Sequence, residues 1–179
     1  MFLLATFGLV IENYCQRNDF FIGLDRTLSA VAGWVKTILT TDQKKTDFNP
    51  VSEQTALATT SPACLRVVKF VKAQAERIRD CLDGKNIELV LLELGLRLHR
   101  VIYDHLQCFT YGAHGVMSVI CDVQEYRKTV ADFKVSPVIT LFDMLHAMCN
   151  LLFMTPENIR SATQVWLLLT APTCTIGYS

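Results

Sequence analysis

The sequence has no net charge, few glycines and prolines, and no long uninterrupted hydrophobic run. Lys plus Arg and Asp plus Glu number 17 each in 179 residues, so no overall field draws this chain to nucleic acid or to an anionic membrane. Charged residues make up 19% of the chain, below the roughly 25% of a typical soluble domain. This shortage of charge predicts either a large core or apolar surface that meets a neighbour.

Neither end of the sequence contains an apolar stretch that is long enough to cross a membrane. The opening MFLLATFGLVI falls short of the roughly 20 residues that a membrane span requires. It also lacks the basic residues and the nearby cleavage site of a signal peptide. The apolar run within VWLLLTAPTCTIGYS, at the other end, is likewise too short. We interpret these segments as a core helix and a tail.

Signatures of common enzyme chemistry are also missing. The sequence contains no phosphate-binding glycine loop, no HExxH motif and no cysteine-protease signature. The cysteines have no close-paired spacing, which is typical of small buried side chains in a reduced, cytosolic protein and not of a disulfide framework. We therefore expect no catalytic residues, no cofactor and no small-molecule substrate. The seven cysteines are Cys15, Cys64, Cys81, Cys108, Cys121, Cys149 and Cys174.

Hydrophobic residues recur at helical spacing, and no strand-like alternation persists. With only 8 Gly and 5 Pro in the chain, long helices fit better than many short strands. This pattern predicts an all-α fold, an antiparallel helical bundle. The first stripe comprises Leu24, Leu28, Val31, Val35 and Ile38, and the second comprises Cys64, Val67, Val71, Ile78 and Leu82.

A short turn separates the second stripe from a third, broadly apolar helix over residues 86–109. We expect Gly84 to end one helix in a left-handed conformation and Asn86 to cap the next. Two helices joined by so short a turn should form an antiparallel hairpin. On the polar side of the third helix, Glu93 and Arg97 form a favourably ordered i, i+4 pair.

The stretch CDVQEYRKTVADF, residues 121–133, crowds a thiol, carboxylates, a phenol and cations into a few helical turns. A catalytic cluster would have to converge on a dry pocket. Here the apolar residues at helical spacing take one face of the helix, and charges of both signs fall on the other. We interpret the segment as a helix with a core face and a solvated face. The core face comprises Val123, Tyr126, Val130 and Phe133, and the solvated face comprises Asp122, Glu125, Lys128 and Asp132.

The following segment, residues 138–154, is apolar nearly all round, so we expect it to be the most central helix. Its narrow polar line comprises Thr140, Asp143, His146 and Asn150. Thr155 followed by Pro156 is typical of a helix start and predicts a further helix.

An alternative with chemistry comes from two doublets, His105 with Cys108 and His146 with Cys149. His and Cys at i, i+3 share a helix face, so two such helices could form a two-His, two-Cys zinc site. The spacing permits this site without being diagnostic of it. A basic side on the helix after Pro62 could meet anionic lipid or an acidic partner, although such a line more often keeps a helix solvated. It comprises Arg66, Lys69, Lys72, Arg77 and Arg79.

Several of these segments, in collinear order over about residues 23–160, resemble the C-terminal region of the exocyst complex component five family, the Sec-ten subunits. They are LDRTL (24–28), DQKKTDF (42–48), DGKN with VLLELGLRLHRVIYDHLQ (83–107), ICDVQEYRK with ADFK (120–134), LFDMLHAMCNLL (141–152) and TPEN (155–158).

The resemblance implies a stacked helical rod of the multisubunit tethering complex type. It also implies a non-enzymatic role in tethering secretory vesicles to the plasma membrane before fusion, with other exocyst subunits as partners. A cytoplasmic location, peripheral at sites of exocytosis, follows, together with peripheral contact with the membrane or with small GTPases. The resemblance brings no metal ligands, no nucleic-acid contact and no assigned partner-binding residues.

Two segments depart from the family pattern and divide the chain into three predicted parts. These are a divergent apolar N-terminal segment (1–22), a helical-bundle domain (23–160) and a divergent tail (161–179). The departures suggest a truncated or alternatively spliced form, or an imperfect gene model. Removing neighbouring helices would expose the faces they cover. A truncated product that is unable to join the complex is therefore a further alternative.

Overall fold

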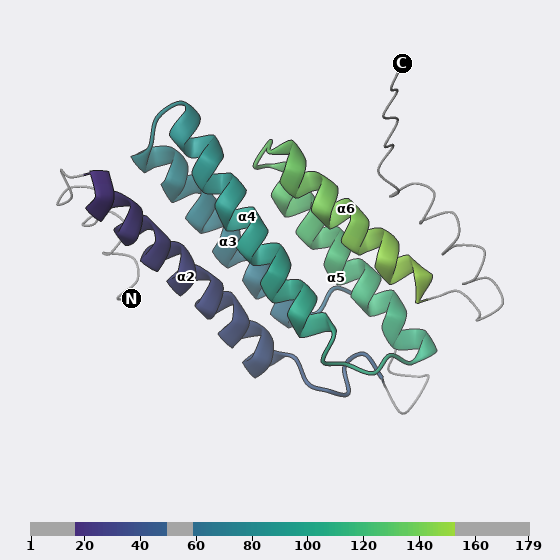
Figure 1. Ribbon diagram of the computed structural model, residues 1–179. Helices are drawn as coiled ribbons and strands as arrows, with labels where there is room; N and C mark the ends of the chain where they lie inside the picture. Colours follow the sequence, from purple (N-terminus) through teal and green to yellow (C-terminus); the bar gives the residue numbers. More distant parts are fainter. Residues whose placement is uncertain (1–16, 50–58, 153–179) are drawn as a thin grey trace, which may run out of the picture.

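The computed structural model describes residues 17–49 and 59–152, and every regular element in these ranges is an α-helix (Figure 1). The all-α prediction is confirmed. The predicted helix start at Thr155, both divergent ends except for residues 17–22, Cys15 and Cys174 lie outside the described residues. The helices are α2 (Arg17–Asp42), α3 (Pro62–Cys81), α4 (Lys85–Leu106), α5 (Ala113–Ala131) and α6 (Ser136–Leu151).

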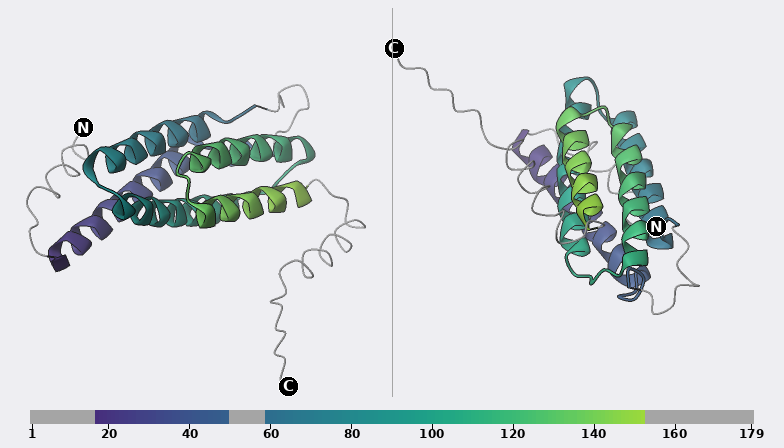
Figure 2. Two further views of the ribbon diagram at one scale, coloured as in Figure 1. Left: turned by 90° about the horizontal axis from the view of Figure 1, so that it is seen from above. Right: turned by 90° about the vertical axis from the view of Figure 1, so that its right-hand side faces the viewer.

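The helices form three tiers that pack side by side. The α3–α4 pair lies in the middle, α2 packs against one side of it, and the α5–α6 pair packs against the other side (Figures 1 and 2). Both hairpins, α3–α4 and α5–α6, are antiparallel, whereas α4 and α6 run in the same direction (Figure 1). No helix in the described ranges has the length and apolar character that a bilayer crossing needs.

The predicted stripes supply the core. On α2, Leu28, Val31, Val35 and Ile38 are buried. All five members of the second stripe are buried on or just beyond α3. Burying such side chains contributes about 1.5–3 kcal/mol each. The spacing of apolar residues therefore determined which face of each helix turned inward.

The turn between α3 and α4 differs in detail from its prediction. Gly84 does have a positive φ, of 53°, but it lies at the N-cap position of α4, and Leu82 is the C-cap of α3. Asn86 lies inside α4 and does not cap it. The prediction of Asn86 as the cap was wrong because the backbone N–H groups of Asn86 and Ile87 are satisfied by the carbonyl groups of the turn, at Asp83 and Gly84.

The placement of α6 was also predicted wrongly. The extensive contacts of this helix are with α5 and α4, and only one of its faces is buried. The buried residues are Val138, Phe142, Leu145 and Cys149. The more central element is α4, which contacts α2, α3 and α6. The apolar residues on the other faces of α6 are therefore exposed, and α6 is an edge helix.

Two close approaches lock the tiers together. A Cβ atom on Gly95 would lie 2.5 Å from Val138 Cγ1, so the glycine lets α4 and α6 come into contact. A Cβ atom on Gly115 would overlap the carbonyl oxygen of Phe48. Phe48 itself is fully buried, and its ring meets that of Phe109 at a centroid distance of 5.0 Å. The loop after α2 therefore packs against the connection between α4 and α5 and against the start of α5.

Two arginines tie neighbouring helices together at the surface. Arg97 on α4 donates to Asp25 Oδ1 at 2.5 Å and to Ser29 Oγ at 2.7 Å, both on α2. It also pairs with Glu93 at 2.7 Å, which confirms the predicted i, i+4 pair. Arg127 on α5 donates to Asp143 on α6 at 2.7 Å through Nε. Each of these exposed pairs contributes modestly to stability, at about 0.2–1 kcal/mol.

Candidate interaction surface

The charged segment on α5 is a helix with a core face, as predicted, but one of its carboxylates is misassigned. Val123, Tyr126 and Val130 are buried. Lys128 is exposed and pairs with Glu125 at 2.6 Å. Asp122, however, is only 1% exposed, so its prediction as part of a solvated face was wrong.

Asp122 is buried because it binds the start of another helix. Its two oxygens accept hydrogen bonds from the backbone N–H and the hydroxyl of Ser61, both at 2.7 Å. Ser61 is the N-cap of α3, and its hydroxyl in turn accepts from the Cys64 N–H at 3.1 Å. The side-chain amide of Gln43 donates to Asp122 at 3.4 Å. His105 at the end of α4 lies 3.2 Å from Gln43 Oε1.

This polar network joins α3, α4 and α5 to Gln43, the residue that follows α2. Burial raises the pKa of Asp122, and the hydrogen bonds from Ser61 and Gln43 oppose that rise. Burial also raises the pKa of the adjacent Cys64 thiol far above its usual range, with Asp122 adding to the effect. A thiol so disfavoured as thiolate is a poor nucleophile. The network therefore serves to hold helices together.

The two His/Cys doublets do not form a common site. His105 faces Gln43 and the ring of Phe109, whereas Cys108 is exposed and bonds to the Asp104 carbonyl of its own helix at 3.3 Å. His146 lies 3.3 Å from Asn150, and Cys149 is buried against α4. Among the described residues, no three metal-binding side chains come together. The zinc hypothesis is therefore not supported by the geometry.

Three members of the basic side of α3 contact neighbouring groups, and two of these contacts are with acidic side chains. Arg66 pairs with Asp42, Lys72 lies 3.9 Å from Asp132, and Arg79 donates to the Asp132 carbonyl at 2.7 Å. The cysteines are mixed in their environments. Cys64 and Cys149 are buried as expected, but Cys81 and Cys108 are exposed, so the prediction that the cysteines are buried was wrong for those two.

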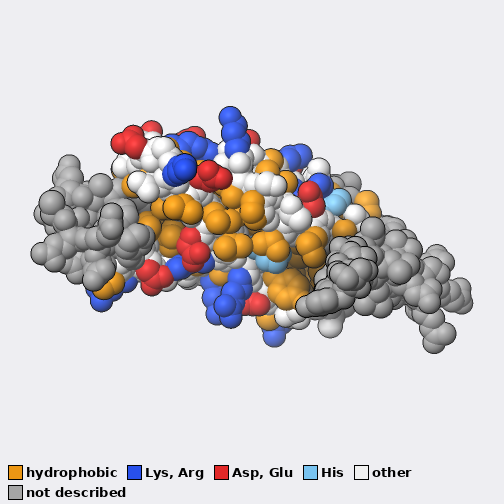
Figure 3. Space-filling view, turned by 45° about the horizontal axis from the view of Figure 1, so that its top comes forward, with side chains coloured by type: hydrophobic (Ala, Val, Ile, Leu, Met, Phe, Trp, Pro, Cys, Tyr) orange, Lys and Arg blue, Asp and Glu red, His pale blue; other side chains and the backbone are white. Residues whose placement is uncertain are grey.

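The structure shows instead an apolar surface, which we call the α4–α6 face. Figure 3 views the molecule from the side where α4 and α6 come forward, and hydrophobic side chains gather across the middle of that face between borders of charged residues. Leu89 is 61% exposed, Leu152 is 47% exposed and Met148 is 39% exposed. The face comprises Leu89, Leu92, Leu96, His99 and Tyr103 from α4, and Leu141, Met144, Met148 and Leu152 from α6.

Ring contacts and close packing place the two stripes side by side. His99 meets the ring of Phe142 at a centroid distance of 5.4 Å in an edge-on arrangement and stacks on Tyr103 at 6.1 Å. Because α4 and α6 are parallel, residues further along α4 lie beside residues further along α6. Gly95 lies beside Val138, and Tyr103 and Leu145 line the same groove. The face is therefore one continuous strip along the junction.

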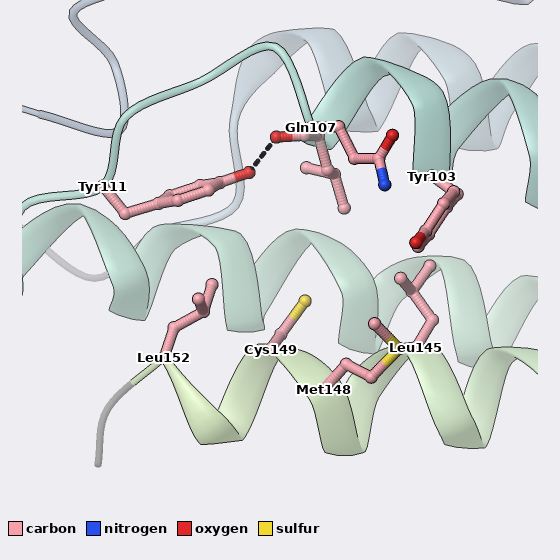
Figure 4. Close-up of a pocket in the computed structure, with 8 residues that line it drawn as sticks. Tyr103, Gln107, Tyr111, Leu145, Met148, Cys149 and Leu152 are labelled. Carbon is pink, nitrogen blue, oxygen red and sulfur yellow. Dashed lines mark hydrogen bonds between the residues drawn. The ribbon is translucent and has the colours of Figure 1, made fainter. Parts of the chain in front are cut away.

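The strip deepens into a groove at the C-terminal ends of the two helices. This groove has a volume of about 160 Å³ and is mostly apolar. Figure 4 shows Tyr103 and Tyr111 on one side of it, with Leu145, Met148, Cys149 and Leu152 rising from α6 on the other. The Tyr111 hydroxyl donates to the Leu106 carbonyl, which fixes that ring as a wall of the groove.

The groove offers shape and apolar contact without reactive groups. Burial raises the pKa of Cys149 to about 11, so its thiol stays protonated near neutral pH. The signal for the surface is present in the sequence as a second apolar spacing along α6 and its C-cap, at Leu141, Met144, Met148 and Leu152. Spacing alone does not distinguish such an exposed apolar face from a second buried face.

Comparison with known proteins agrees with the helical architecture. Residues 16–168 match the model of the family described as exocyst complex component Sec10-like, alpha-helical bundle. The chain is 50% identical over 151 residues to exocyst complex component 5 of Homo sapiens, which covers 84% of this chain and 21% of the relative. It is 50% identical over 139 residues to that of Drosophila melanogaster, covering 77% and 19%.

A more distant relative is exocyst complex component 5 of Caenorhabditis elegans, which is 35% identical over 147 residues, covering 82% of this chain and 22% of the relative. The chain thus spans about a fifth of the length of the curated relatives that it matches. The helical tiers and the sequence identity over most of the chain lead to one assignment: this chain belongs to the Sec10-like family of exocyst complex components.

Proposed function

We propose that this chain forms a helical-bundle section of an exocyst subunit and takes part in tethering secretory vesicles to the plasma membrane before fusion. The observation that carries the proposal is 50% identity to human exocyst complex component 5 over 84% of the chain. The role is non-enzymatic. Two groups of residues support this role. The carboxylate of Asp122 is engaged in a buried hydrogen-bond network, and the two His/Cys doublets lie apart from each other.

The mechanism is mechanical. Buried stripes hold the tiers of helices in a rigid arrangement, and arginine bridges such as that of Arg97 keep them in register. Other exocyst subunits are the proposed partners, and they bind exposed helix faces with energy concentrated in a few residues. Peripheral contacts with the membrane or with small GTPases, and a cytoplasmic location at sites of exocytosis, belong to the same proposal.

The experiment is a tagged pull-down of the full chain from cytosol, with the bound proteins identified by mass spectrometry. We expect other exocyst subunits to be recovered. Leu145→Asp, which places a charge at a site only 3% exposed, is the unfolded control and should recover none. A soluble, helical wild-type chain that recovers no exocyst subunit would contradict the proposed function.

A further inference from the structure

The α4–α6 face ends where the described chain ends. Leu152 lines the groove and is the last described residue, so the chain continues directly from the rim of an apolar surface. Exposed apolar side chains, such as Met144 at 37% and Met148 at 39%, extend back from this point along α6. Contiguous exposed apolar surface of this kind often marks a site where another element binds.

The sequence that follows contains a complementary stripe. Thr155 and Pro156 are typical of a helix start. Beyond them, Ile159, Ala162, Trp166 and Leu169 are spaced three, four and three residues apart. The polar residues Arg160, Ser161, Thr163 and Gln164 fall between them in the first half, and Val165, Leu167 and Leu168 widen the apolar side in the second half. This spacing is typical of an amphipathic helix whose apolar face is narrow at its start and broad at its end.

The length of this segment also suits the surface. A helix over residues 156–169 would be about 20 Å long, and α6 from Leu141 to Leu152 spans about 17 Å, at about 1.5 Å per residue. The match to the helical-bundle family continues to residue 168, past the end of α6. The following segment therefore has the length to cover the face by folding back along it.

We propose that residues 156–169 dock as an amphipathic helix on the α4–α6 face of the same chain, antiparallel to α6. With a turn centred on residue 154, the register places Ile159 opposite Cys149, at the groove, and Trp166 opposite Phe142, over the ring of His99. The indole would then cover the middle of the strip, between Leu96 and Leu141.

The chain's own segment is favoured over a second copy because of its tether. Only residues 152–155 separate α6 from the proposed helix, and so short a connection gives an effective concentration in the millimolar range. A second copy would have to match that concentration in solution. The proposal goes beyond the exocyst role, and its test uses the purified chain alone, so its failure would leave the proposed function untouched.

The test is tryptophan fluorescence of the full chain carrying Trp34→Phe. The sequence contains 2 Trp, so this variant leaves Trp166 as the only indole. Trp34 is 46% exposed, and its replacement should leave the bundle folded. We expect Trp166 to emit at short wavelength and to be quenched by acrylamide several-fold less than free N-acetyltryptophanamide.

Three further variants in this background locate the contact. Met148→Glu, in the groove, and Ile159→Ser, in the segment itself, should each increase quenching of Trp166 several-fold. Leu65→Glu is the matched control because Leu65 is a 54% exposed leucine on α3, and it should leave quenching unchanged. Circular dichroism checks that each variant keeps its helices, and Ile159→Ser alters no residue of the described bundle.

Each contrary result overturns the inference. Quenching of Trp166 equal to that of free indole would show that the segment does not dock. Protection that is unaffected by Met148→Glu and Ile159→Ser would place the segment elsewhere. Protection that disappears on dilution, together with a dimer in sedimentation equilibrium, would assign the face to a second copy.

Discussion

At the scale of the residue, burial separates groups that look alike in the sequence. Asp122 and Glu125 lie within one helical turn on α5, yet Asp122 is buried against the N-terminus of α3 and Glu125 pairs with Lys128 at the surface. The difference depends on whether a neighbouring helix brings unsatisfied backbone donors to the carboxylate. Helix N-termini have such donors, and here the serine cap and the aspartate share them.

Asp122→Ala should reduce the free energy of unfolding by about 2–3 kcal/mol, because the Ser61 N–H and hydroxyl would lose their acceptors inside the protein. Urea denaturation followed by circular dichroism measures this. The matched control is Glu125→Ala, on the same helix, which should change stability by less than about 0.5 kcal/mol since its partner is an exposed lysine. Equal losses for the two variants would contradict the buried network.

Stability should also depend on pH through partly buried histidines. Burial lowers the pKa of His99 and of His105 below the ordinary value of 6.5. Below that value the unfolded chain binds more protons than the folded chain, so this contribution is fully present above pH 6.5 and is lost as the pH falls through the window toward the folded pKa. Asp122 acts in the opposite direction, since its pKa is raised above 3.8.

We therefore expect the chain to lose stability on acidification from about pH 7 to about pH 5.5, and the His99→Leu variant to lose less. Denaturation curves at the two pH values measure the difference. His146→Leu is the comparison variant. Burial and Arg127 also lower the pKa of His146, but this residue is less buried than His99, so its replacement should alter the slope less. Identical pH dependence in wild type and His99→Leu would contradict the assignment.

At the scale of the element, close helix contact depends on single small residues. Gly95 lies at the contact between α4 and α6, and Gly33 lies on α2 with no atom near its absent Cβ. Both are helical glycines, and glycine lowers helix stability relative to alanine by about 0.5–1 kcal/mol. The same substitution should therefore have opposite signs at the two positions.

Gly95→Ala should destabilise the protein by about 1–3 kcal/mol, because the new methyl group would overlap Val138 and force α4 and α6 apart. Adding Val138→Ala should recover part of the loss by making room. Gly33→Ala should instead stabilise by about 0.5–1 kcal/mol. Thermal unfolding of the three variants and the wild type measures both signs. Stabilisation by Gly95→Ala would show that the two helices do not approach as described.

At the scale of the whole molecule, the three tiers share one core. Leu94 and Leu145 lie in different tiers and are 2% and 3% exposed, and both belong to the same buried cluster. Loss of either side chain should therefore be felt throughout the bundle.

Leu94→Asp or Leu145→Asp should abolish cooperative unfolding, because each variant buries an unpaired charge in this shared core. Leu89→Asp is the matched control on α4, at a leucine that is 61% exposed, and it should leave the transition cooperative. Calorimetry distinguishes the outcomes. A cooperative transition in Leu145→Asp would mean that the α5–α6 tier does not share the core.

The sequence by itself determined the fold class and the inward face of most helices, because the spacing of apolar residues is a local property that each helix carries alone. The stripe on α2 and the core face of α5 were predictable for this reason, as was the family. The segment boundaries at residues 22 and 160 stay predictions.

Only the tertiary structure decided which surfaces met. Asp122 became buried because α3 brought its cap to α5, and α6 became an edge helix because α4 took the central position. The His/Cys doublets separated because the depth and rotation of each helix depend on all its neighbours. The spacing of apolar residues within one segment does not specify how distant helices are placed. The placement of α4 and α6 left the α4–α6 face exposed.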